Sequence, residues 1–179
     1  MSHFKILKTL EKREYGNKFS VERLLVELPD GRKTEFYMRS GQDYAIVVPV
    51  VGESTLIMVE QPRLGMEEIS LEFPMGQVAG ETDENIAIRE LKEETGYASG
   101  KLTLLGRLLP SPGWSMQHAQ VYLAEDLTEG LAEPEPFEEI TVRKVEIKEL
   151  KQLIAERKMK SMPTIAAFHM YLQHAENLR

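Results

Sequence analysis

The chain has 179 residues, 42% of them apolar, which is enough to bury a hydrophobic core in one domain with a small additional unit. Its formal net charge of −7 argues against a non-specific nucleic-acid binder, which needs a basic face, so nucleic acid is not an expected partner. It has no cysteine, which excludes disulfides and thiol-bound zinc, and its N-terminus lacks the features of a secretory signal, so we expect a cytoplasmic protein.

Residues 1–40 are predicted to form a small antiparallel β unit. Segments 4–15, 19–28 and 33–39 are compatible with strands. The sequence Pro-Asp-Gly ending at Gly31 predicts a turn between the last two, because proline presets φ and glycine accepts a positive φ. Such a meander buries little surface alone and leaves its edges open. We therefore expect it to pack on the main domain or on a second copy of the chain, and we predict a homodimer.

Residues 41–179 are predicted to form the main domain, of mixed α/β (α+β) class. The run 44–51 is apolar and β-branched, which predicts a strand buried on both faces; it is far shorter than the roughly 18 to 20 residues that span a membrane. In segment 68–73, Ile69, Leu71 and Phe73 alternate with polar residues, as in a strand with one buried face. The other predicted elements are strands at 54–60, 102–109, 118–124 and 141–147, and helices at 148–157 and 163–177.

Residues 82–95 give the clearest helix prediction. Thr82 is suited to cap its N-terminus, and Gly96 is suited to end it. Its apolar side chains are expected to face the sheet: Ile86, Ala87, Leu91 and, beside them, Ile88.

Three glutamates project from another side of this helix. Glu90, Glu93 and Glu94 are spaced i, i+3 and i+4, so their carboxylates lie within reach of one another. Grouped hard oxygen ligands of this kind suit Mg²⁺ or Mn²⁺. The alternative is a solvated helix face on which Lys92 supplies a mobile counter-charge.

The residues around these glutamates resemble the Nudix signature GX5EX7REUXEEXGU, in which U is a bulky apolar residue. Every fixed position from Glu81 to Tyr97 matches. Gly76 matches the first glycine, although four residues rather than five separate it from Glu81, and Gly80 is suited to turn this shorter loop. The resemblance implies the Nudix fold, a mixed β-sheet sandwiched between helices, with a loop–helix–loop that holds divalent cations.

The resemblance also implies roles for the residues of the signature. Glu90 and Glu94 are expected to bind the metal, and Glu93 is expected to be a ligand or the catalytic base. The backbone carbonyl near Met75 is a further expected ligand. Arg89 is expected to orient the glutamates through an ion pair, with an ordinary surface position as the alternative.

Segments outside the signature are similar to those of the ADP-ribose and nucleotide-sugar branch of the family. Segment 109–115 is similar to its PSPGxS loop, with Pro112 sixteen residues after Gly96; judged without the signature, this segment is an ordinary strand connection. Trp114 is expected to anchor the loop, with stacking on a base as the alternative.

Two arginines and a glutamate are expected to serve the substrate. The guanidinium groups of Arg39 and Arg63 match phosphate geometry, and Arg63 lies in a segment similar to the QxR of this branch. Glu72 lies in a segment similar to the Glu-Leu-Pro before the signature and is expected to support Arg63 or the metal. Surface positions for the arginines and a half-exposed strand position for Glu72 are the alternatives.

The catalytic base of this branch comes from an acidic loop after the signature. Segment 127–139 is acidic and interrupted by prolines, and Glu138 fits the base best when the next strand includes 140–142. Glu135 and Glu139 are the alternatives.

Together these segments imply a Mg²⁺-dependent hydrolase of a small nucleotide. The expected reaction splits the diphosphate bond of ADP-ribose or a nucleoside diphosphate sugar into a nucleoside monophosphate and a sugar phosphate. One alternative is another substrate, such as a dinucleoside polyphosphate, NADH or capped RNA, the last being disfavoured by the negative charge. The other alternative is a Nudix-like module that binds nucleotide without cleaving it, which would be expected to have lost metal positions that are present here.

Overall fold

The chain forms two compact units in the computed structural model. The structure describes residues 3–16, 19–77, 82–134, 136 and 138–178. The first unit comprises Met1–Asp43 together with Leu109–His118, and the second comprises Tyr44–Leu108 and Ala119–Arg179. The return of residues 109–118 to the first unit was not predicted, because it depends on backbone contacts between segments far apart in the sequence.

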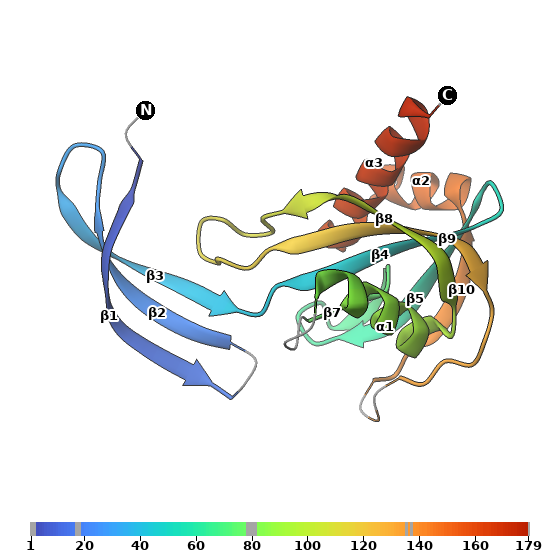
Figure 1. Ribbon diagram of the computed structural model, residues 1–179, viewed down its shortest axis with the longest axis horizontal. Helices are drawn as coiled ribbons and strands as arrows, with labels where there is room; N and C mark the ends of the chain where they lie inside the picture. Colours follow the sequence, from blue (N-terminus) through green and yellow to red (C-terminus); the bar gives the residue numbers. More distant parts are fainter. Residues whose placement is uncertain (1–2, 17–18, 78–81, 135, 137, 179) are drawn as a thin grey trace. The chain divides into compact units, whose positions relative to one another are not determined.

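The first unit contains a three-stranded antiparallel sheet (Figure 1). Its strands are β1 (Lys5–Tyr15), β2 (Phe19–Glu27) and β3 (Lys33–Gly41), in the order β1-β2-β3. In the predicted turn before β3, the Gly31 amide donates to the Leu28 carbonyl at 2.9 Å, and Gly31 has a φ of 83°. The predicted antiparallel arrangement of these segments is therefore confirmed.

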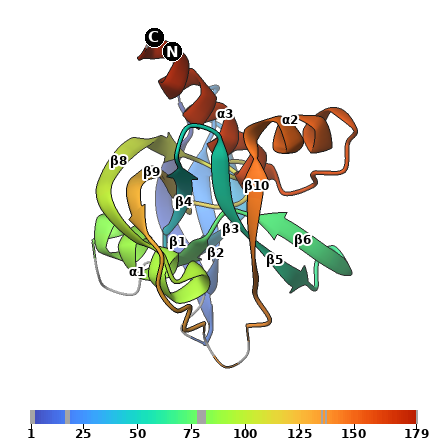
Figure 2. The ribbon, with the colours of Figure 1, turned by 90° about the vertical axis from the view of Figure 1, so that its right-hand side faces the viewer.

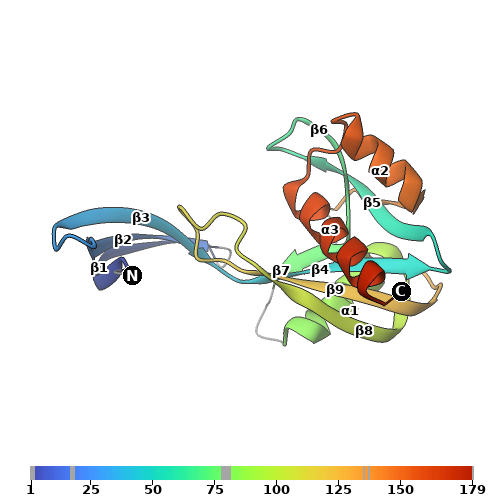
Figure 3. The same cartoon turned by 90° about the horizontal axis from the view of Figure 1, so that it is seen from above.

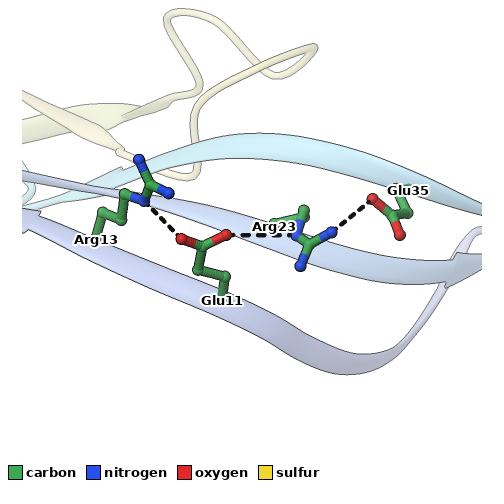
Figure 4. A network of polar contacts seen from close by, with 4 residues as sticks. All are labelled: Glu11, Arg13, Arg23 and Glu35. Carbon is green, nitrogen blue, oxygen red and sulfur yellow. Dashed lines mark hydrogen bonds and ion pairs between the residues drawn. The ribbon is translucent and has the colours of Figure 1, made fainter.

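One face of this sheet carries a chain of charges, and the other buries apolar side chains. Glu11 lies opposite Arg23 in the strand register, and it binds Arg13 at 2.6 Å and Arg23 at 3.6 Å; Arg23 also binds Glu35 at 3.3 Å (Figure 4). Because these side chains are at least a third exposed, solvent screens each pair and it contributes little to stability. On the opposite face of β2, Leu24 is only 2% exposed.

The second unit is a mixed β-sheet between helices (Figures 2 and 3). Its elements are β4 (Tyr44–Val51), β5 (Thr55–Arg63), β6 (Glu68–Glu72), β7 (Met75–Gln77), α1 (Asp83–Thr95), β8 (Ala98–Leu108), β9 (Ala119–Thr128), β10 (Thr141–Glu146), α2 (Ile147–Ala155) and α3 (Met162–Asn177). The strand order is β10-β5-β4-β9-β8; β4 and β9 run parallel, and the other pairs are antiparallel. Only the three-residue β7 has no counterpart among the predicted elements. None of the helices within the described residues is long and apolar enough to cross a membrane.

The core of this unit lies on both faces of the sheet. Alternate residues of β4 enter two apolar clusters: Ala45 and Val47 pack with α1, whereas Ile46 and Val48 pack with α2 and α3. The predicted double burial of this strand is thus confirmed. The apolar side chains of α1 pack as predicted, except that Ile88 is 44% exposed and faces solvent.

The sheet forks between β4 and β5. These strands pair only at two positions beside their turn, after which β6 pairs with β5 and β7 pairs with β4. The Val47 amide donates to the Pro74 carbonyl at 2.9 Å, so the chain crosses the fork between β6 and β7. Helix α1 packs against β4 and β7. The fork therefore brings the segment before the Nudix-like helix next to that helix.

The prediction of an inward-facing Ile69 in β6 is wrong. Ile69 is 71% exposed; it pairs with Pro62 next to the turn of the β5–β6 hairpin, where no described side chain covers it fully. Phe73 is fully buried and Leu71 packs on the core, as predicted. The polar Glu72 is also buried, at 5% exposed.

Candidate active site

The ends of α1 are fixed by local interactions. The Asn85 amide donates to the hydroxyl of Thr82 at 3.3 Å, as expected of an N-cap. Gly96 has a φ of 78° and donates to the Lys92 carbonyl at 2.8 Å, which ends the helix in the left-handed conformation that glycine favours. The two predicted boundaries of the helix are confirmed.

Two of the three glutamates are buried. Glu90 is 9% exposed and Glu94 is 2% exposed, so the alternative of a solvated face is wrong for both. One carboxylate oxygen of Glu94, Oε2, is buried without a hydrogen-bond partner among the described residues. A hydrogen bond from the Met75 backbone reaches the Glu94 carboxylate. A buried carboxylate with an unpaired oxygen is costly unless a cation completes its environment.

Gly76 leaves room for the carboxylate of Glu90. A Cβ atom on Gly76 would lie 2.0 Å from both Cδ and Oε1 of Glu90. Glycine at this position of β7 thus allows the acidic side chain to lie directly against the backbone. Residues 78–81, which include Gly80 and Glu81 of the shortened loop, lie outside the described residues.

Arg89 pairs with two of the glutamates. Its Nη1 is 2.7 Å from Glu93 Oε2 and its Nη2 is 2.8 Å from Glu90 Oε1. These contacts match the expected orienting ion pair. Glu93 is half-buried and turned toward Arg89. Consistent with this, no three acidic or histidine side chains in the described part of the chain converge closely enough to hold a metal ion as they stand.

The glutamates and Glu138 interact electrostatically. Burial, followed by the charges of Glu90 and Glu138, raises the pKa of Glu94 to about 9. Burial is also the main cause that raises the pKa of Glu90 to about 7; Arg89 acts against this increase, whereas Glu93 and Glu138 contribute to it. Glu138, the predicted base, is therefore close enough to act on both buried carboxylates. This concentration of negative charge and oxygen donors fits a bound divalent cation.

Arg63 and Glu72 form a partly buried ion pair, in which the Arg63 side chain is 39% exposed. Nη2 of Arg63 lies 2.7 Å from Glu72 Oε2 and Nε lies 3.2 Å from it, and the Glu72 side chain is 7% exposed. Burial acts to lower the pKa of Arg63, but the hydrogen bonds and charge of Glu72 raise it overall, with help from the charges of Glu94 and Glu138. The half-exposed alternative for Glu72 is wrong, and its expected support of Arg63 agrees with the geometry.

A groove lies beside Glu138, in the acidic loop (residues 129–140) that joins β9 to β10. It has a volume of about 380 Å³. It is lined by Glu60, Gln61, Pro62, Ile69, Glu138, Glu139, Ile140 and Thr141. Gln61 is 6% exposed, and its amide nitrogen has no hydrogen-bond partner among the described residues. Gln61 was not predicted as a site residue, although it precedes Arg63 by two positions; Glu135 lies outside the described residues.

Arg39 belongs to the first unit. Its Nη1 donates to Gln117 Oε1 at 2.7 Å, and its guanidinium lies 4.8 Å from the centre of the Phe19 ring. Gln117 is 6% exposed and donates in turn to the Gln42 carbonyl at 2.7 Å. Arg39 is therefore held in a fixed orientation. Gln117 was not predicted, because nothing in the sequence shows that it meets a residue 78 positions earlier.

The segment that contains Pro112 is fastened to Arg39 by its backbone. The Arg39 amide donates to the Trp114 carbonyl at 2.7 Å, and the Met116 amide donates to the Arg39 carbonyl at 3.0 Å. The Trp114 side chain is 56% exposed, so the expectation that this ring anchors the loop is wrong. Pro112 is exposed in the turn before it.

The buried glutamates of α1 lie within a segment of the chain that matches a protein-family model. Residues 41–165 match the model described as the NUDIX domain. The chain belongs to the Nudix family. This match includes α1 and the acidic loop, and it excludes most of the first unit.

Two sequences and one solved structure are similar to this Nudix chain over most of its length. It is 34% identical over 157 residues to the ADP-ribose pyrophosphatase of Bacillus subtilis (strain 168), covering 86% of this chain and 84% of that protein. It is 31% identical over 157 residues to the methanol dehydrogenase activator of Bacillus methanolicus, with the same coverage, 86% and 84%. A crystal structure of an ADP compounds hydrolase has the same fold, with a TM-score of 0.82, 24% identity, and coverage of 98% of this chain and 95% of that one. The predicted Nudix fold is confirmed.

Proposed function

We propose that this Nudix protein hydrolyses the diphosphate bond of ADP-ribose or a nucleoside diphosphate sugar. The products would be a nucleoside monophosphate and a sugar phosphate. The observation that carries this proposal is the pair of buried carboxylates, Glu90 and Glu94, with Glu138 and Arg63 as electrostatic neighbours. This arrangement combines acceptors for a cation with a donor for phosphate. The name of the Bacillus subtilis relative supports ADP-ribose as the first substrate to test.

The acidic side chains suit Mg²⁺, with Mn²⁺ as a substitute. Glu90, Glu94, Glu93 and the carbonyl of Met75 are the groups that would hold it. The unpaired Oε2 of Glu94 and the raised pKa values of Glu90 and Glu94 fit such a cation. When bound, the metal would neutralise charge on the diphosphate and make a water molecule more acidic.

The protein's own residues would position the substrate and move the proton. Arg63 is oriented by Glu72 through Nε and Nη2, and its Nη1 makes no hydrogen bond to any residue that the structure describes, so that edge is suited to a phosphate oxygen. Glu138 is the preferred base for the attacking water, because it lines the groove and its charge acts on both Glu90 and Glu94. We propose Arg39 and Pro112 as further substrate-binding residues.

Incubation of the purified protein with Mg²⁺ and a substrate panel tests this proposal. The panel contains ADP-ribose, nucleoside diphosphate sugars, dinucleoside polyphosphates and NADH, and chromatography identifies the products. We expect AMP and ribose 5-phosphate from ADP-ribose, and no products when EDTA replaces Mg²⁺. Cleavage of only a dinucleoside polyphosphate or NADH would change the substrate class, and metal-dependent binding without cleavage would favour a nucleotide-binding regulator.

We propose that the first unit mediates a homodimer. Phe4 and Ile6, on the same face as Phe36 by ring contact and strand register, are 62% and 56% exposed, which is apolar surface that a second copy of a small meander could cover. Size-exclusion chromatography with light scattering is expected to give a mass twice that of the 20.5 kDa monomer. Ile6→Glu is expected to shift the mass toward 20.5 kDa, and Lys33→Glu, at an exposed position of the same sheet, is the control. A wild-type mass of 20.5 kDa at micromolar concentration would contradict the dimer.

A further inference from the structure

The C-terminal end of α1 lies in backbone contact with the start of the acidic loop. A Cβ atom on Gly96 would lie 2.6 Å from the Gly130 carbonyl oxygen and 2.7 Å from the Ala132 nitrogen. Conversely, a Cβ atom on Gly130 would lie 2.9 Å from the Gly96 carbonyl oxygen. Two glycines are thus needed for the helix end and the loop to approach this closely.

A hydrogen bond joins the same two segments. The Glu133 amide donates to the carbonyl of Glu93 at 2.9 Å. This carbonyl belongs to the last turn of the helix, where carbonyls have no partner within the helix. The loop therefore completes the hydrogen bonding of the helix that carries the buried glutamates.

An ion pair lies beside this contact. Lys144 of β10 is 3.0 Å from Glu129 at the start of the loop, and its Nζ lies 5.8 Å from the centre of the Tyr97 ring. Tyr97 directly follows Gly96 and is 4% exposed. Because the Lys144–Glu129 pair is itself exposed, most of the fastening must come from the backbone contacts.

We infer that Gly130 is a positioning residue, whose contact with Gly96 fixes the start of the acidic loop and so limits where Glu138 can lie relative to Glu90 and Glu94. Glu138 is the fifth residue after Glu133, which limits the reach of the chain between them to about 18 Å. On the other side of Glu138, Thr141 pairs with Glu60 in the sheet. The loop is thus held on both sides of Glu138, whose charge acts on Glu90, Glu94 and Arg63. This inference rests on the proposed function.

Gly130→Val tests the inference, because its branched side chain would push the loop away from Gly96. We expect kcat for ADP-ribose to fall roughly 10- to 100-fold with KM changed less than about threefold, since a small displacement of a catalytic group costs turnover more than binding. Hydrogen exchange of the Glu133 amide is expected to accelerate in the variant. Gly130→Ala is the milder variant and is expected to give a smaller loss of kcat. It serves as the test if Gly130→Val does not fold.

Gly100→Val is the matched control. A Cβ atom on Gly100 would likewise be crowded, because it would lie 3.0 Å from Cβ of Asp126 in β9. It would contact neither the end of α1 nor the acidic loop. We expect it to lower thermal stability while kcat and the exchange of the Glu133 amide stay near wild-type values. Unchanged kcat in both Gly130 variants, or an equal loss of kcat in Gly100→Val, would overturn the inference alone. A wild-type protein without turnover of any nucleotide diphosphate would overturn the proposed function, and this inference with it.

Discussion

Glu94→Gln is expected to lower kcat for ADP-ribose by on the order of 10²- to 10³-fold, because it removes a proposed metal ligand while the fold is kept. The same change is expected to stabilise the metal-free protein at neutral and alkaline pH. The pKa of Glu94 is raised from 4.5 to about 9 in the folded state, so folding binds a proton between these values. Wild-type stability is therefore expected to fall as the pH rises from about 4.5 to about 9, and glutamine removes the part of this dependence that comes from Glu94, while the part from Glu90 stays.

Urea unfolding in EDTA from pH 5 to pH 9, together with turnover in Mg²⁺, tests both parts of this expectation. The stability gain of Glu94→Gln should be small at pH 5 and should grow with pH. Glu84→Gln, an exposed position on the same helix, should change neither turnover nor the pH dependence of stability. Full activity of Glu94→Gln, or a gain that shrinks as the pH rises, would contradict the assignment.

Arg63→Met is expected to destabilise the protein by about 1 to 2 kcal/mol, because it leaves the buried carboxylate of Glu72 without its partner, whereas Arg63 itself is 39% exposed and partly screened by solvent. The double variant Arg63→Met, Glu72→Leu should recover most of this loss, since apolar residues can replace a buried ion pair at little cost. Both variants should have low turnover, because each lacks the phosphate donor.

The comparison of the two variants separates stability from catalysis. Urea unfolding measures the first, and kcat and KM for ADP-ribose measure the second. Recovery of both stability and activity in the double variant would show that Arg63 serves only the fold. Equal stability of Arg63→Met and the wild type would show that Glu72 is solvated or finds another partner.

The catalytic helix and the buried strand of the second unit were predicted from the sequence because their signals are local. Caps and helical spacing define α1 within its own residues, and the continuous apolar run of β4 predicts its burial. The glutamates were placed on one helix by spacing alone. Their burial was not predictable, since it depends on Gly76 and the forked sheet.

The features that the sequence did not reveal depend on contacts between distant segments. The alternation in β6 is a correct strand signal, but the exposure of Ile69 near the turn of the β5–β6 hairpin depends on which distant segments cover that end. Gln117 and Arg39 meet only through folding. The contact between Gly96 and Gly130 also joins two segments that are distant in the sequence. Each glycine can be seen in the sequence, but no local pattern predicts that the two meet.

The pairing of Leu108 with Ala119 has a consequence for how this protein can be altered. These residues are neighbours across β8 and β9 although ten residues, Leu109–His118, leave the second unit between them. The register of β8 and β9 is therefore set by the pairing of Leu108 with Ala119. It does not depend on the length or composition of residues 109–118. A segment exchanged or lengthened there is expected to leave the glutamate helix and its sheet unchanged, so this stretch can vary, in nature or by grafting, separately from the buried glutamates.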